Sequence, residues 1–323
     1  MSLMREMALI EQVKADLIKV EAYLADSLNT GSEDFNQLIR PISAAGGKRL
    51  RARLCLLIAG SGNAPEEKRI PIAAAVEMLH LATLIHDDVL DQAAVRRGAP
   101  AIHCSKGNKV AILSGDYLFA KAFDVVAQIE SVACLRVFSF IISALVEGEF
   151  MQMEDVFCIT QGTERYLTKT QKKTADFIEA CLELGGILGD WTSEETTLLK
   201  QYGHGLGMAF QITDDIMDYC ATSDTTGKPV GKDLREGLIT YPLLSIITKE
   251  NEQYITDTVH AIAGGQAADE LIEYVTAQGG VAKAEALEAT YREQATTALA
   301  ALPEFAGKSV LYEVLDSLAH RKV

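Results

Sequence analysis

The stretch MLHLATLIHDDVLD, residues 78–91, places a mostly apolar run directly before three aspartates, and GMAFQITDDIMD, residues 207–218, repeats the pattern. On an α-helix the first, second and fifth positions of a DDxxD motif fall within about 100° of one face, so each copy presents three carboxylates to one place. Clustered carboxylates away from open water repel one another unless a cation lies between them. The pattern predicts two helix-borne cation sites, with a solvated acidic helix face as the alternative.

Apolar residues recur at helical spacing along nearly the whole chain, and sustained β-branched alternation is missing. This periodicity predicts an all-α fold, a large antiparallel helical bundle with a central ligand cavity. No break in composition and no linker divides the chain, so we expect one domain over residues 1–323. Helices are expected near 4–28, 48–60, 67–91, 109–127, 129–156, 164–187, 194–219 and 239–248, with shorter helices between 251 and 320.

The composition excludes several classes of protein. A net charge of −15 argues against a nucleic-acid surface, which needs clustered Lys and Arg. Six cysteines without CxxC pairing indicate free thiols in a reducing cytosol, so we expect a cytoplasmic protein. The stretch Val137–Val146 is far shorter than the ~20 apolar residues of a membrane span. We expect no transmembrane segment, and peripheral membrane contact stays open.

Basic residues are few and lie near the acidic motifs. In GGKRLR, residues 46–51, two glycines let backbone N–H groups approach an anion, and Lys48 and Arg51 share a helix face. A solvated helix start is the alternative interpretation of this segment. Arg96 and Arg97 follow the first acidic motif. Together these cations predict a second anion site, held directly by Lys and Arg.

Two further basic positions are candidates. Lys228 lies in a turn beyond the second motif, and His80 lies two helical turns before Asp87 on the same side. His80 has the reach to donate to a phosphate, although a core or capping role is the alternative for a lone histidine. Lys172 is expected to be solvated, and His86 has no clear role.

Six segments follow one another along the chain: GGKRLR (46–51), DDVLDQAAVRRG (87–98), KKTA (172–175), GMAFQITDDIMD (207–218), GKPVGKDL (227–234) and REGLITYPLL (235–244). In this order they resemble the trans-prenyltransferases, or polyprenyl diphosphate synthases. The resemblance implies the helical bundle of the isoprenoid synthase type, a homodimer, and Mg²⁺-dependent condensation of isopentenyl diphosphate with an allylic diphosphate. Two positions depart from the family pattern, Ala52 for a frequent Pro and Leu238 for a frequent Lys.

The resemblance also implies a role for each matching residue. The two aspartate motifs would hold three Mg²⁺ ions around the allylic diphosphate, through Asp87, Asp88, Asp91, Asp214, Asp215 and Asp218. The allylic site would include Arg96, Lys173, Thr174, Gln211 and Lys228. The isopentenyl diphosphate site would include Gly47, Lys48, Arg51, His80 and Arg97. Of these, the residues expected to act in catalysis are Asp87, Asp88, Asp91, Lys173, Thr174, Gln211 and Asp214.

The residues before Asp87 bear on product length, because the growing apolar tail should run along that helix away from the metals. In the family that the chain resembles, an aromatic residue at these positions blocks elongation early, whereas small residues leave the tunnel open. The small side chains of Ala82 and Thr83 therefore predict products longer than the fifteen-carbon farnesyl chain. Ordinary core packing explains any of these positions equally well. Deeper candidates for the end of the tunnel are Met78, Leu79, Leu118, Phe119 and Phe123.

Two other functions use similar motifs. A class I terpene cyclase binds Mg²⁺-diphosphate through aspartate-rich helices, but usually lacks the second DDxxD and lines its pocket with aromatic residues, which make up 7% of this chain. A non-catalytic or partner-dependent subunit of a heteromeric synthase would be expected to lose some of the charged residues. All of them are present here.

Overall fold

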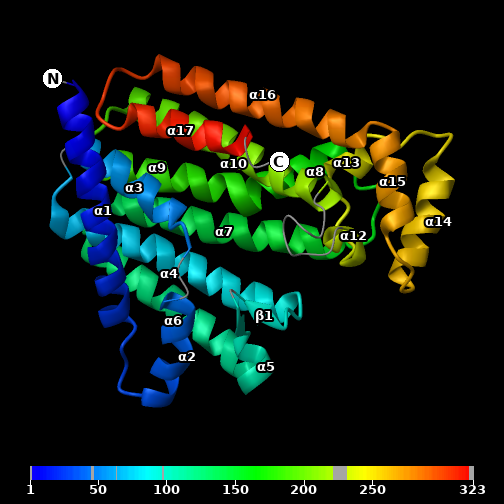
Figure 1. Cartoon of the computed structure of the whole chain (residues 1–323). Coiled ribbons are helices and arrows are strands. Elements are labelled where there is room, and N and C mark those ends of the chain that lie inside the picture. Colours follow the sequence, from blue (N-terminus) through cyan, green and yellow to red (C-terminus); the bar gives the residue numbers. More distant parts are fainter. Residues whose placement is uncertain (1, 45–46, 63, 97, 221–230, 320–323) are drawn as a thin grey trace. The chain divides into compact units, whose positions relative to one another are not determined.

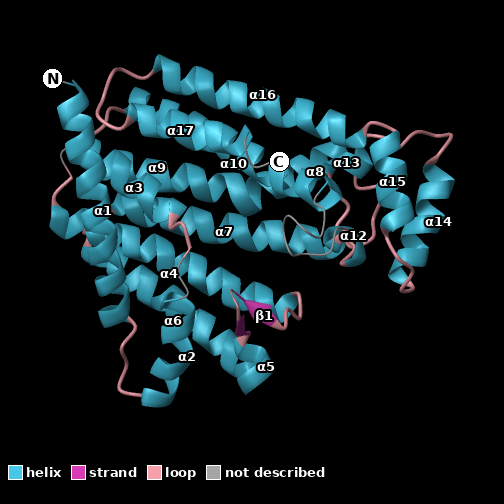
Figure 2. Ribbon diagram, in the orientation of Figure 1, coloured by secondary structure: helices cyan, strands magenta, loops and turns pink. Residues whose placement is uncertain are grey.

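The computed structural model describes residues 2–44, 47–62, 64–96, 98–220 and 231–319. Almost all of its regular structure is helical (Figures 1 and 2), which confirms the all-α prediction. The elements are α1 (Ser2–Ser27), α2 (Glu33–Ala44), α3 (Leu50–Ser61), α4 (Glu66–Leu90), β1 (Val95–Arg96), β2 (Ala99–Pro100), α5 (Ile102–Lys106), α6 (Asn108–Gln128), α7 (Val132–Glu154), α8 (Gly162–Thr170), the π-helix η1 (Gln171–Ala175), α9 (Asp176–Leu188), α10 (Ser193–Cys220), α12 (Lys232–Arg235), α13 (Tyr241–Leu244), α14 (Glu252–Ala263), α15 (Asp269–Ala277), α16 (Gly280–Ala301) and α17 (Lys308–Ala319).

The chain forms two compact units, and each is described by itself. Unit 1 contains residues 1–139, 180–197 and 304–307, and so carries the first acidic motif. Unit 2 contains residues 140–179, 198–303 and 308–323, and so carries the second. The single domain and the central cavity stay predictions.

Helix α4 is the centre of unit 1. Glu66 and Glu67 in its first turn complement the helix dipole, and every residue from Ile72 to Leu79 is buried. It packs most extensively against α6, and also against α3 and α1. Within the described residues, α4 is the one helix long and apolar enough to cross a membrane, but 67% of its most apolar window is buried inside the protein. That burial is typical of a core helix.

Helix α10 is the corresponding helix of unit 2. It begins at a reciprocal capping box, in which the Thr192 N–H donates to Glu195 Oε2 at 2.9 Å and the Glu195 N–H donates to Thr192 Oγ1 at 3.2 Å. At Gly207, a Cβ atom would lie 2.5 Å from Ala175 Cα. The glycine therefore lets η1 pass close to α10, which matters for the site below.

Three expected helices differ from those observed. The helix expected at 164–187 is divided into α8, η1 and α9, and the helix expected at 239–248 is reduced to α13. Between 251 and 320, α16 is a long helix, whereas short ones were expected. Helix α2, which contains Pro41, was not expected.

Candidate functional site

The first acidic motif lies at the carboxyl end of α4. The Asp91 N–H donates to the Asp87 carbonyl at 2.8 Å and closes the last turn. Asp87 is half-buried, Asp88 is buried and Asp91 is exposed. The three carboxylates therefore run from the interior of unit 1 to its surface, as expected for a charged helix end that borders both.

Arg96 is tied directly to this motif. Its Nε donates to Asp88 Oδ1 at 2.7 Å, and its second guanidinium nitrogen lies 2.5 Å from the same oxygen. The arginine is carried by β1, which pairs antiparallel with β2 in a short hairpin. The structure thus brings together two residues that were predicted separately, whereas the predicted Arg97 lies outside the described residues.

The cations of the basic GGKRLR segment differ in their surroundings. Gly47 has a φ of 139°, a conformation that residues with a side chain rarely adopt. Arg49 points inward, with Nε 2.7 Å from Glu21 and a terminal nitrogen 3.0 Å from Glu77, so it serves the fold. Lys48 is exposed and Arg51 is half-buried. Gly46 lies outside the described residues.

The two histidines of α4 have different surroundings. His86 packs over Gly115 of α6, where its Nε2 lies 3.1 Å from the Ile112 carbonyl oxygen. A Cβ atom on Gly115 would lie 2.2 Å from that ring, so His86 fills the space of a side chain at the helix contact. His80 is half-buried, and its carbonyl accepts the Thr83 hydroxyl at 2.8 Å. His86 therefore has a packing role that the sequence did not indicate.

The candidate chain-length residues lie on α4 and α6. Ala82 and Leu118 are fully buried in one apolar cluster, with the half-buried Phe119 packed against it. Met78 and Leu79 are fully buried and Thr83 is half-buried. Phe123 lies at the surface, with its ring centroid 5.7 Å from that of Phe138.

Hydrogen bonds link the second acidic motif to residues of α8 and η1. The Thr174 hydroxyl donates to Gln211 Oε1 at 2.9 Å, and Gln211 Nε2 donates to Asp215 Oδ1 at 3.0 Å. The Tyr166 hydroxyl donates to Asp215 Oδ2 at 2.5 Å. Three predicted site residues are thereby linked, because η1 passes close to α10 at Gly207. Tyr166 was not predicted.

Asp218 has a local structural task. Its two carboxylate oxygens accept the backbone N–H groups of Lys232 and Asp233 at 3.0 and 2.9 Å, which caps α12. Asp233 itself is a further carboxylate beside the motif, which the sequence interpretation missed although GKDL was among the matching segments. The predicted Lys228 lies outside the described residues.

The carboxylates of the second motif carry a surplus of negative charge. Burial raises the pKa of Asp215 to about 6, and the charges of Asp214 and Asp218 add to the rise. Burial also raises the pKa of Asp233 to about 8, again helped by Asp215 and Asp218. Such mutual repulsion is what a bound cation relieves.

The donor set fits a hard divalent cation that also binds substrate. Within the described ranges, no three His, Cys, Asp or Glu side chains are placed to hold an ion by themselves. Mg²⁺ sites commonly use one or two carboxylates, with waters and phosphate oxygens completing the octahedron. The all-oxygen set at Asp214, Asp215 and Asp218 therefore fits Mg²⁺ with a diphosphate better than it fits a fully protein-bound ion.

Asp215→Asn should stabilise the metal-free protein at neutral pH. The folded-state pKa of Asp215 is raised from 3.8 to about 6, so the folded state binds the proton more tightly and loses stability as pH rises through this window. Relative to wild type, the variant should gain up to about 3 kcal/mol in free energy of unfolding between pH 4 and pH 7, because the hydrogen bond from Tyr166 or Gln211 that its amide no longer accepts is lost equally at both pH values. Denaturant unfolding of wild type and variant in a chelator, at pH 4 and at pH 7, measures this change in the free energy of unfolding. An equal effect at both pH values would contradict it.

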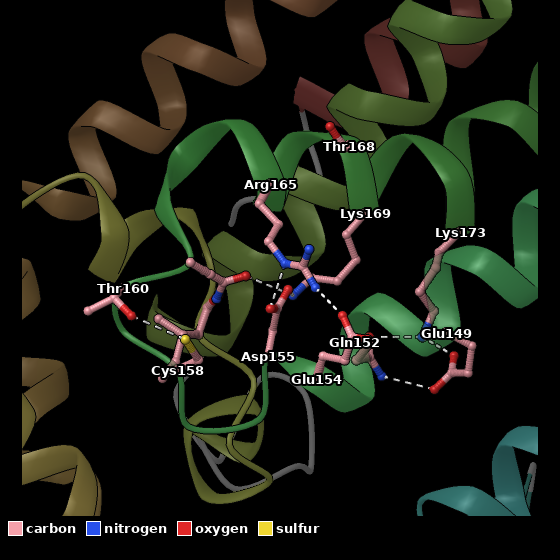
Figure 3. A network of polar contacts seen from close by, with 12 residues as sticks. Glu149, Gln152, Glu154, Asp155, Cys158, Thr160, Arg165, Thr168, Lys169 and Lys173 are labelled. Carbon is pink, nitrogen blue, oxygen red and sulfur yellow. Dashed lines mark hydrogen bonds and ion pairs between the residues drawn. The ribbon is translucent and has the colours of Figure 1, made fainter.

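The side chain of Lys173 extends toward α7, where its partners lie outside the hydrogen-bonded set of Thr174, Gln211 and Asp215. Figure 3 shows its ammonium beside Glu149 and Gln152, which were not predicted to belong to the site. Its Nζ donates to Gln152 Oε1 at 2.8 Å and lies 2.5 Å from Glu149 Oε2. No local signal identifies these partners, because they lie on a different helix.

The family model for polyprenyl synthetase matches residues 32–278. The nonaprenyl diphosphate synthase of Mycobacterium tuberculosis is 36% identical over 315 residues, covering 96% of this chain and 93% of that protein. Component 2 of the heptaprenyl diphosphate synthase of Geobacillus stearothermophilus is 32% identical, covering 89% and 88% of the two chains. A crystal structure of a polyprenyl synthase from Caulobacter crescentus, complexed with calcium and isoprenyl diphosphate, is 31% identical, with a TM-score of 0.88 and coverage of 98% and 97%.

These similarities extend over almost the whole chain and include both acidic motifs. They confirm the prediction of a prenyltransferase made from the ordered segments. The chain belongs to the polyprenyl synthetase family of prenyl diphosphate synthases.

Proposed function

We propose that this protein condenses isopentenyl diphosphate with an allylic diphosphate, repeatedly, to give a trans-polyprenyl diphosphate longer than fifteen carbons. The observation that carries the proposal is the linked set of Thr174, Gln211 and Asp215, which are residues of two separate family segments joined by hydrogen bonds at the second acidic motif. The long-chain relative from Mycobacterium tuberculosis supports the product class.

The allylic diphosphate is bound by the acidic motifs and their neighbouring cations. Asp87, Asp88, Asp91, Asp214, Asp215 and Asp218 would hold Mg²⁺, three ions with substrate bound, and Arg96, Lys173 and Lys228 would contact the diphosphate. When bound, Mg²⁺ neutralises the charge that develops on the departing diphosphate. The ion pair to Asp88 supports this role for Arg96, because it holds the guanidinium beside the motif.

Isopentenyl diphosphate is bound without metal, by Gly47, Lys48, Arg51, His80 and Arg97. The exposed Lys48 and the open backbone at Gly47 are suited to a phosphate. Arg49 forms ion pairs with Glu21 and Glu77, so it is not included in this site.

The reaction follows from the charges. The carbon–oxygen bond of the allylic substrate breaks and its electron pair leaves with the diphosphate, producing an allylic cation. Oxygen dipoles of Thr174 and Gln211 stabilise that cation. The double bond of isopentenyl diphosphate then attacks it, and the released diphosphate accepts the proton that is lost. No side-chain nucleophile is needed.

The protein acts as a homodimer in the cytoplasm. It forms one domain, and its membrane contact is at most peripheral. The homodimer is supported by the part of α7 that belongs to unit 2, where Val146, Phe150 and Met153 are exposed on one helix face. Phe150→Glu should therefore shift the protein to a monomer in light scattering. Tyr254→Glu, on the exposed face of α14, serves as the control. A dimer that survives Phe150→Glu would contradict this interface.

Purified protein incubated with Mg²⁺, isopentenyl diphosphate and allylic primers of several lengths tests the function. We expect product with at least one primer and none in a chelator. Absence of product with every primer, followed by activity on adding a second subunit, would favour a heteromeric enzyme like that of Geobacillus stearothermophilus. A cyclic hydrocarbon from the allylic substrate alone would favour a terpene cyclase.

A further inference from the structure

Two side chains of α7 hold the ammonium of Lys173. Gln152 Oε1 accepts from Lys173 Nζ at 2.8 Å, and Glu149 Oε2 lies 2.5 Å from the same nitrogen. Gln152 Nε2 also lies 3.5 Å from Glu149 Oε1, so the three residues form a closed triangle (Figure 3). Glu149 and Gln152 lie one helical turn apart on the same face of α7.

The backbone is shaped to make this contact. A Cβ atom at Gly148 would lie 2.7 Å from Lys173 Cγ and 3.3 Å from the backbone nitrogen of Lys173. A larger residue at position 148 would therefore push Lys173 away. Lys173 also lies in the π-helix η1, where the Asp176 N–H bonds to the Gln171 carbonyl five residues back. Such wide turns are common at functional sites. Glycine and π-turn together set where Lys173 meets α7.

A second group of contacts joins Asp155, the residue that follows α7, to α8, the helix that leads into η1. Asp155, which is buried, accepts from Arg165 Nε at 2.7 Å and from Lys169 Nζ at 3.1 Å. Lys169 Nζ also donates to Gln161 Oε1 at 2.9 Å. Figure 3 shows this group beside the Lys173 triangle. The loop between α7 and α8 is thereby closed, which keeps Lys173 opposite its partners.

We infer that Glu149 and Gln152 are positioning residues for the allylic diphosphate, and that they act by aiming Lys173. An ammonium has three N–H donors. Two are directed to α7, which leaves the third to point in one fixed direction. Pre-positioning of this kind lowers the cost of binding an anion, because the long lysine side chain is ordered in advance. The inference rests on the proposed role of Lys173 at the allylic site.

Glu149→Gln tests the inference, with Glu147→Gln as a matched control. Glu147 lies 2.6 Å from Lys172 Nζ, so it makes the same kind of ion pair with the adjacent lysine, at a more exposed position. We expect Glu149→Gln to lower kcat/KM for the allylic diphosphate about tenfold, mainly through KM. KM for isopentenyl diphosphate should stay within about twofold, and Glu147→Gln should change neither by more than that.

A double-mutant cycle separates positioning from general damage to the fold. In a Lys173→Met background, Glu149→Gln and Gln152→Ala should have little further effect, because their role passes through Lys173. Losses that multiply independently of Lys173 would overturn the inference. So would a Glu149→Gln enzyme that matches Glu147→Gln, or one that binds the allylic substrate more tightly. An inactive wild-type protein would instead reject the proposed function.

Discussion

Asp87→Asn and Asp214→Asn should each lower kcat for condensation about a thousandfold while leaving the fold intact. These are the first aspartates of the two motifs, and both are half-buried. Each substitution keeps the size of the side chain and removes one charge that would hold Mg²⁺ beside the leaving diphosphate. Steady-state rates at saturating substrates, with circular dichroism of each variant, measure the effect.

Substitutions at the second position of each motif are less specific tests. Asp88 holds Arg96, and Asp215 accepts from Tyr166 and Gln211, so changes there disturb several groups together. Asp124→Asn is a suitable control, since it removes an exposed carboxylate from α6. Near-normal kcat in both Asp87→Asn and Asp214→Asn would remove the aspartates from the chemistry.

Ala82→Phe should shorten the product. Ala82 is fully buried between α4 and α6, in the same cluster as Leu118, and lies five residues before Asp87. If the apolar tail grows along α4, a phenyl ring at this position would meet it within about one and a half helical turns of the metals. Chromatography of dephosphorylated products from wild type and variant reports the change directly.

Overpacking of the core by itself could also destabilise the protein, so Ala82→Phe is compared with two further variants. Ala74→Phe places the same ring at an equally buried position of α4, two turns farther from the motif, and should leave product length unchanged. Thr83→Phe, at a half-buried position, gives a second blocking variant that disturbs the core less. An unchanged product distribution in both Ala82→Phe and Thr83→Phe would reject this tunnel.

Local patterns predicted the helices that carry the chemistry. The apolar run before Asp87 and the capping box at Thr192 are both contained within a few residues, and α4 and α10 begin and end within one or two residues of the expected bounds. The aspartates could likewise be identified as site candidates because their spacing is itself the signal. Helix α2 was missed.

Contacts between elements far apart in the chain could not be predicted in this way. Gln152 and Lys173 are 21 positions apart, and Tyr166 and Asp215 are 49 apart. Nothing in the local sequence distinguishes Glu149, which meets the site lysine, from Glu147, which meets its neighbour. Arg49 shows the converse, because its motif suggested anion binding while its partners Glu21 and Glu77 assign it to the fold.

Repeated condensation by this chain can be measured as the number of isopentenyl units added to each allylic primer. Purified protein with Mg²⁺, a ten-carbon allylic primer and labelled isopentenyl diphosphate gives this number as the ratio of label to product. We expect two or more units per primer and no incorporation in a chelator. A ratio of one, or incorporation that does not depend on a divalent cation, would rule out repeated, metal-dependent condensation.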